Sequence, residues 1–130
     1  MTEIKLFTKI LLIIEAILWL LFGILLMFLF DLTMNPEGWT NPYLPKGFGG
    51  VNFLAGIFAI LMLRKKEWEE IKFLFEFFLA LLLLTFILEM TVFITIGLAY
   101  ENSIMSHMFN LIVEGGLFIL SLVAYIKQRR

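Results

Sequence analysis

The chain has 130 residues, of which 62% are hydrophobic and fifteen are phenylalanine, and its net charge is −1. A water-soluble domain of this length cannot bury so much apolar surface, so the composition excludes that class. The balanced charge predicts no nucleic-acid partner. The chain has no cysteine, which excludes disulfides, thiol chemistry and cysteine-ligated metal sites.

Four apolar runs predict transmembrane helices over residues 6–30, 48–63, 71–100 and 105–126. A helix needs roughly 20 residues to cross the hydrocarbon core of a bilayer. The second run is short, so either the local bilayer is thinner or this helix begins earlier, near Tyr43. The predicted fold class is therefore all-α: an integral membrane four-helix bundle made by a single domain, residues 1–130.

The basic residues predict the orientation of this bundle. With four spans, nine of the ten Lys and Arg fall on one side of the membrane, and only Lys46 falls on the other. Because cytoplasmic loops carry an excess of basic residues, we expect both termini and the connection 64–72 in the cytoplasm, with the protein in the plasma (cell) membrane. Helical spacing in that connection pairs Lys65 with Glu69 and Lys66 with Glu70.

The predicted outer connection, residues 31–48, contains all three prolines of the chain and two glycines. These residues disfavour a continued helix and favour turns. Two interpretations stay open: an ordered connector at the membrane interface, or a lid over the outer mouth of the bundle.

Three glutamates, Glu15, Glu89 and Glu114, lie inside predicted spans. A carboxylate in the bilayer costs several kcal/mol, so it usually faces the protein interior or a wet cavity. Each of the three is either a hydrogen-bonded packing group or a group that binds a ligand or a proton. Glu76 lies near the cytoplasmic end, where its spacing predicts an ion pair with Lys72.

Helical angles place polar residues of the last span on one face. At about 100° per residue, they fall within an arc of roughly 60°, and Tyr125 extends the same face. We call this face the polar stripe and expect it to point inward, with Glu114 hydrogen-bonded to another helix. The stripe comprises Ser103, His107, Asn110, Glu114, Ser121 and Tyr125.

Two other spans add candidates. Trp19 shares a face with Glu15, and Asn52 lies on a small-residue face where helix backbones approach closely; that face comprises Gly49, Asn52, Ala55, Gly56 and Ala59. The polar faces of all four helices are predicted to converge. The candidate ligand- or proton-binding residues are therefore Glu15, Trp19, Asn52, Glu89, His107, Asn110 and Glu114.

Metal binding is not predicted. His107 and Glu114 are seven residues apart, or roughly 10 Å along a helix, whereas the Glu and His ligands of di-metal bundles lie one turn apart. The chain has no P-loop, no G-x-G-x-x-G, no G-x-S-x-G and no H-E-x-x-H. No cofactor is predicted either.

Residues 23–36, followed by Gly49, Gly50, Asn52 and Gly56 at the opening of the second span, resemble the small four-helix DoxX-like membrane proteins. The resemblance covers nearly the whole chain and implies a fold more than an activity. Glu15 also matches the single helix 1 glutamate of the small multidrug resistance transporters, although the residues around it differ.

Three function classes remain open. The first is a binding or accessory protein that holds a lipid-like or other amphipathic ligand, or a cationic small molecule, in a carboxylate-lined cavity. The second is a proton-coupled transporter of a small solute, which requires a homo-oligomer because one chain of four helices encloses little room. The third is a membrane enzyme in which a glutamate performs acid–base chemistry on a lipid.

Overall fold

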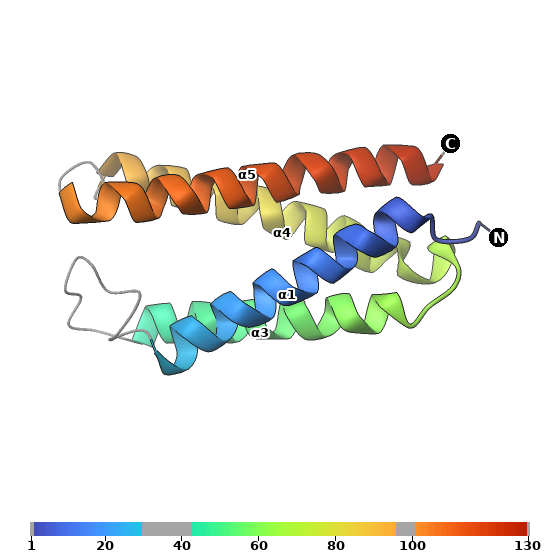
Figure 1. Cartoon of the computed structure of the whole chain (residues 1–130), viewed down its shortest axis with the longest axis horizontal. Coiled ribbons are helices and arrows are strands. Elements are labelled where there is room, and N and C mark those ends of the chain that lie inside the picture. The colour runs from blue at the N-terminus through green and yellow to red at the C-terminus, as the bar shows by residue number, and fades with distance from the viewer. Residues whose placement is uncertain (1, 30–42, 96–100, 130) are drawn as a thin grey trace. The chain divides into compact units, whose positions relative to one another are not determined.

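The computed structural model describes residues 2–29, 43–95 and 101–129. These ranges hold four helices, α1 (Leu6–Phe28), α3 (Tyr43–Leu63), α4 (Trp68–Thr95) and α5 (Glu101–Arg129), drawn in Figure 1. Each contains an apolar stretch long enough to cross a bilayer, where a helix satisfies its own backbone hydrogen bonds. The predicted fold class, all-α with four helices of spanning length, is confirmed, and the chain is an integral membrane protein.

The helix bounds differ from the predicted ranges mainly at α3, which begins at Tyr43 rather than residue 48. Pro45 is tolerated there because the first turn of a helix has no use for the missing N–H. At about 1.5 Å per residue, the 21 residues of α3 span roughly 31 Å, so no thinner bilayer is required. Residues 31–42 of the predicted outer connection and residues 96–100 lie outside the described ranges.

The chain forms two compact units, Met1–Ile71 and Lys72–Arg130. In the first, α1 and α3 run antiparallel and touch through glycines. A Cβ added at Gly23 would lie 2.6 Å from the backbone nitrogen of Phe53, and one at Gly56 would lie 2.6 Å from Cγ of Leu20. These helices therefore pack at a distance that only glycine permits. The five residues of the predicted small-residue face are all buried.

The N-terminal segment, residues 2–4, is attached to the connection between α3 and α4. The Ile4 N–H donates to the Lys66 carbonyl at 3.0 Å, and the Trp68 N–H donates to the Thr2 carbonyl at 2.7 Å. The Thr2 hydroxyl and backbone N–H donate to the Glu69 carboxylate at 3.2 and 3.0 Å. The predicted pairing of Lys65 with Glu69 is therefore wrong, because Thr2 bonds to Glu69 and Lys65 pairs with Glu70 instead, at 3.0 Å.

In the second unit, α4 and α5 form an antiparallel hairpin. Tyr125 on α5 bonds to Glu76 near the start of α4, and Asn110 bonds to Glu89 nearer the end of α4. Their outer faces carry exposed apolar side chains such as Phe73, which is 83% exposed. In water this exposure would be costly, but in a bilayer these faces contact lipid tails.

Candidate functional site

The α4–α5 hairpin brings three of the predicted site residues together. His107 Nδ1 lies 2.5 Å from Glu89 Oε1, and the Asn110 side-chain amide donates to the same oxygen at 3.3 Å. The Glu89 and His107 side chains are 17% and 11% exposed. Helical spacing explains the cluster, because His107 and Asn110 are three residues apart and present their side chains on one face of α5. The Glu89 carboxylate of α4 therefore contacts two side chains of α5, those of His107 and Asn110.

Glu114 lies one turn beyond Asn110 on the same face of α5. Because Asn110 binds Glu89, Glu114 lies about one helical turn from that contact. Its Oε2 atom is buried and has no hydrogen-bond partner among the described residues. The predicted hydrogen bond between Glu114 and another helix is not formed through this oxygen.

Two glycines follow Glu114 on α5. A Cβ added at Gly116 would meet no atom within 4 Å, whereas one at Gly115 would meet the Phe86 ring at 3.0 Å. Gly115 thus packs against α4 and Gly116 does not. At about 100° per residue, Gly116 lies about 160° around α5 from Glu114, so its open space belongs to the opposite face of the helix.

The polar stripe continues toward the other end of the hairpin. Ser121 is buried, and the Tyr125 hydroxyl donates to Glu76 Oε1 at 2.6 Å. The prediction that Glu76 pairs with Lys72 missed this bond, because sequence spacing reveals neighbours on one helix but not the register between two. Helical spacing predicts the face of α5 on which Tyr125 lies. It does not predict which residue of α4 Tyr125 contacts. The Ser103 side chain lies outside the described part of the chain.

The remaining candidates belong to the α1–α3 pair. Glu15, Trp19 and Asn52 are 1%, 6% and 3% exposed. The Trp19 indole N–H and the Asn52 side-chain carbonyl have no hydrogen-bond partner within the described residues. The seven predicted residues thus fall into two sets, one in each unit, and their convergence stays a prediction.

The chemistry available in the α4–α5 set is that of paired carboxyl groups with one imidazole. Glu89 and His107 can share a proton, and Glu114 can accept a hydrogen bond or a positive charge. Within the described ranges, no group of three or more His, Asp and Glu side chains is arranged to hold a metal ion.

Comparison with known proteins adds no family to this description. No family model matches the chain, and neither a curated protein nor a solved structure matches it. The resemblance to DoxX-like proteins therefore stays a prediction, and the case for a function rests on the geometry of the α4–α5 hairpin.

Proposed function

We propose that this membrane protein binds a small amphipathic molecule whose polar end carries an amine or hydroxyl, and that Glu114 receives that donor. The observation that supports this is the buried Glu114 Oε2 atom, which has no hydrogen-bond partner in the described ranges. A buried acceptor left without a donor costs about 1–3 kcal/mol. A bound amine or hydroxyl removes that cost, so the site favours ligands with a donor over ligands without one.

Glu89 is the weaker candidate for the same role. Its Oε1 atom already accepts from Asn110 and faces His107. A ligand at Glu89 would have to replace these protein bonds, whereas a ligand at Glu114 replaces none. An ammonium group forms a charge-assisted hydrogen bond with a carboxylate, so Glu114 favours an amine over a hydroxyl on the ligand.

The apolar surroundings of the α4–α5 hairpin indicate that the ligand has an apolar part. Ile112 and Ile119 of α5 are 69% and 61% exposed, and at about 100° per residue they lie on the face of the helix opposite Glu114. That face contacts lipid tails in a bilayer, so an amphipathic ligand reaches the hairpin from the membrane.

Thermal unfolding of the purified protein in detergent micelles tests this proposal. Dodecylamine, dodecanol and the methyl ether of dodecanol serve as probes with a charged donor, a neutral donor and no donor. A ligand at 100 times its Kd stabilises by about 2.7 kcal/mol. We expect the Tm to rise most with the amine, less with the alcohol and least with the ether.

Glu114→Gln should reduce the Tm rise caused by the amine, and Glu76→Gln should not. The second variant is the matched control. It removes the Glu76 carboxylate from the same hairpin, and this carboxylate already accepts a hydrogen bond from Tyr125. Equal stabilisation by the ether, or an undiminished response of Glu114→Gln, contradicts binding at Glu114.

Proton-coupled transport is a second candidate, supported by the length of the polar stripe. Polar contacts between α4 and α5 occur at both ends, at His107 and at Tyr125. These residues are about 27 Å apart along α5, which is close to the roughly 30 Å of a hydrocarbon core. Glu114 and Ser121 lie between them. As a transporter the chain would act as an oligomer.

Liposomes with a trapped pH dye separate the two candidates. The probe in this experiment is a concentration gradient of a water-soluble amine, such as ethylamine, in place of dodecylamine. A transporter moves protons across the liposome membrane in response to this gradient, and Glu114→Gln abolishes that movement. Binding of dodecylamine without any ethylamine-driven proton movement supports the binding function and contradicts transport.

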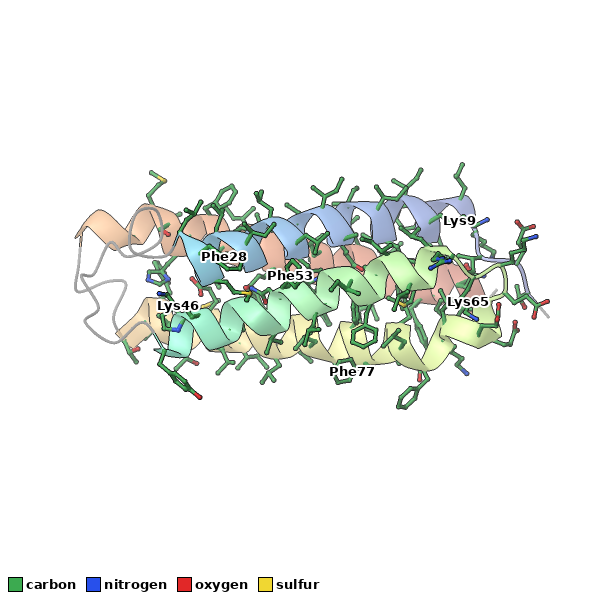
Figure 2. The ribbon with its side chains drawn as sticks, turned by 90° about the horizontal axis from the view of Figure 1, so that it is seen from below. Lys9, Phe28, Lys46, Phe53, Lys65 and Phe77 are labelled. Atoms are coloured by element: carbon green, nitrogen blue, oxygen red, sulfur yellow. The ribbon has the colours of Figure 1, made fainter. Side chains whose placement is uncertain are left out.

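We also propose that both termini face the cytoplasm of a plasma-membrane protein. In the α1–α3 unit, Lys9 and Lys65 lie at one end and Lys46 at the opposite end (Figure 2), in agreement with the basic-residue rule. Because the chain has no cysteine, single cysteines at Tyr43 and Lys127 can be probed on intact cells with an impermeant thiol reagent. Labelling of Tyr43→Cys alone is expected, and labelling of Lys127→Cys alone reverses the orientation.

A further inference from the structure

The connection between α3 and α4 contains a shallow hollow of about 410 Å³. Arg64, Lys65, Lys66, Glu67 and Glu70 line it, and we call it the connection hollow. The hollow belongs entirely to the first unit, whereas the residues of the proposed function belong to the second. Its volume is within the range of ligand pockets, about 300–1,000 Å³.

The depth of the hollow is fixed by the apolar segments on both sides. The apolar segment of α3 ends at Leu63 and that of α4 begins at Trp68. Residues 64–67 are therefore the first ones outside the hydrocarbon core, at the level of lipid headgroups. In Figure 2, Lys65 and Lys9 lie at the same end of the helices, as expected for residues at one membrane surface.

The charges of the hollow are only partly compensated. Lys65 Nζ donates to Glu70 Oε1 at 3.0 Å, so these two side chains offset each other. Neither Arg64 nor Lys66 has an ion-pair partner among the described residues. Two exposed cations therefore stand beside one remaining carboxylate, Glu67.

The backbone under the hollow is held in place by the N-terminal segment. The bonds from Ile4 to Lys66 and from Trp68 to Thr2 cross the connection on both sides of Glu67. Ile4 and Trp68 are themselves 2% and 4% exposed. A site whose backbone is fixed before binding loses less entropy when a ligand arrives.

We propose that the connection hollow binds the phosphodiester headgroup of a glycerophospholipid, with Arg64 and Lys66 on the phosphate. A guanidinium contacts two phosphate oxygens at once, and an ammonium adds a point charge. The carboxylates of Glu67 and Glu70 repel a dianionic phosphate but accept hydrogen bonds from hydroxyl or ammonium groups next to a phosphodiester. The hollow therefore favours headgroups that donate hydrogen bonds, as in phosphatidylglycerol and phosphatidylethanolamine, over phosphatidylcholine.

Native mass spectrometry of the purified protein, titrated with each of the three lipids, tests this proposal. We expect phosphatidylglycerol and phosphatidylethanolamine to bind several-fold more tightly than phosphatidylcholine. Arg64→Gln with Lys66→Gln should weaken phosphatidylglycerol binding by tenfold or more, since a basic residue near the surface contributes about 1 kcal/mol. Equal binding of the three lipids overturns the proposal.

The matched control is Lys5→Gln with Lys9→Gln, which removes the same charge from the same end outside the hollow. This double variant should retain at least half of the affinity, and an equal loss in both double variants would mean general attraction to a basic surface. A millimolar concentration of inorganic phosphate should not displace the lipid. Displacement would identify a free-anion site and overturn the headgroup assignment.

Glu67→Gln distinguishes the loss of a binding site from misfolding of the protein, because it is expected to increase an affinity. Removing this carboxylate relieves repulsion of a dianionic headgroup, so the variant should bind phosphatidic acid several-fold more tightly than the wild type does. A misfolded protein does not gain affinity. An unchanged or weaker affinity for phosphatidic acid contradicts the role of Glu67 in the hollow.

Discussion

The two helix pairs are closed by different kinds of contact. Between α1 and α3, Gly23 and Gly56 bring the helices so near that an added Cβ would lie 2.6 Å from the other helix. Between α4 and α5, long polar side chains meet, as Tyr125 does with Glu76 and His107 with Glu89. Figure 1 shows each pair as two neighbouring helices of similar length, so the difference lies in side chains and not in architecture.

This difference indicates which pair can respond to a ligand. Glycine contacts depend on shape alone, so they cannot be exchanged for contacts with a ligand. Polar contacts in a membrane can be exchanged for contacts with a ligand or a proton, and they are worth only about 0.6–2 kcal/mol each. The α4–α5 pair is therefore the one whose contacts a small molecule can replace.

The largest expected effect follows from filling the α1–α3 contact. Gly23→Leu places a side chain where the Phe53 backbone nitrogen would be 2.6 Å from Cβ. The backbones must separate, so we expect a loss of about 3 kcal/mol or more in the free energy of unfolding. Equilibrium unfolding in mixed micelles measures it.

Gly47→Leu is the control for this change, because a Cβ at Gly47 meets nothing within 4 Å. It should not destabilise the protein and should stabilise it by up to about 1 kcal/mol, because leucine loses less backbone entropy than glycine in a helix. If Gly23→Leu and Gly47→Leu are equally stable, the α1–α3 pair does not depend on close backbone approach.

A medium effect is expected from removing the shared acceptor of the α4–α5 pair. Glu89→Ala leaves His107 and Asn110 without this oxygen, and the expected loss in the free energy of unfolding is about 1–3 kcal/mol. Tyr125→Phe removes a single bond and should cost about 0.6 kcal/mol, the average of such bonds in membranes. The same unfolding assay compares them.

A double-mutant cycle sharpens this prediction. His107→Ala combined with Glu89→Ala should cost less than the sum of the two single losses, because both remove one interaction. Strict additivity would show that the 2.5 Å contact between these side chains contributes no stability.

The sequence predicted what depends on a single helix. The four spans and the buried face of α3 follow from periodicity, and the structure has both. In the polar stripe, His107 and Ser121 are buried, and Asn110, Glu114 and Tyr125 are partly buried. The register between α4 and α5 could not be predicted, because it is set by packing between the two helices, as at Gly115 against Phe86. This register brings His107 and Asn110 to Glu89.

Contacts made by irregular segments were also beyond sequence reasoning. The N-terminal segment has no periodicity, so its backbone bonds to Lys66 and Trp68 left no pattern to read. Those bonds direct Thr2 to Glu69, and Lys65 then pairs with Glu70. The helical spacing rule failed there because a tertiary contact competed with it.

The smallest expected effect compares two adjacent glycines of α5. Gly116→Ala adds a methyl group in open space and should stabilise the helix by about 0.5–1 kcal/mol, because alanine loses less backbone entropy than glycine on folding. Gly115→Ala gains the same entropy but pushes its methyl group to 3.0 Å from the Phe86 ring. The ring must shift, so the net stabilisation should be smaller than that of Gly116→Ala or absent. An equal gain at both positions in the unfolding assay would mean that α4 and α5 are not packed at Gly115, and that polar side chains alone close this pair.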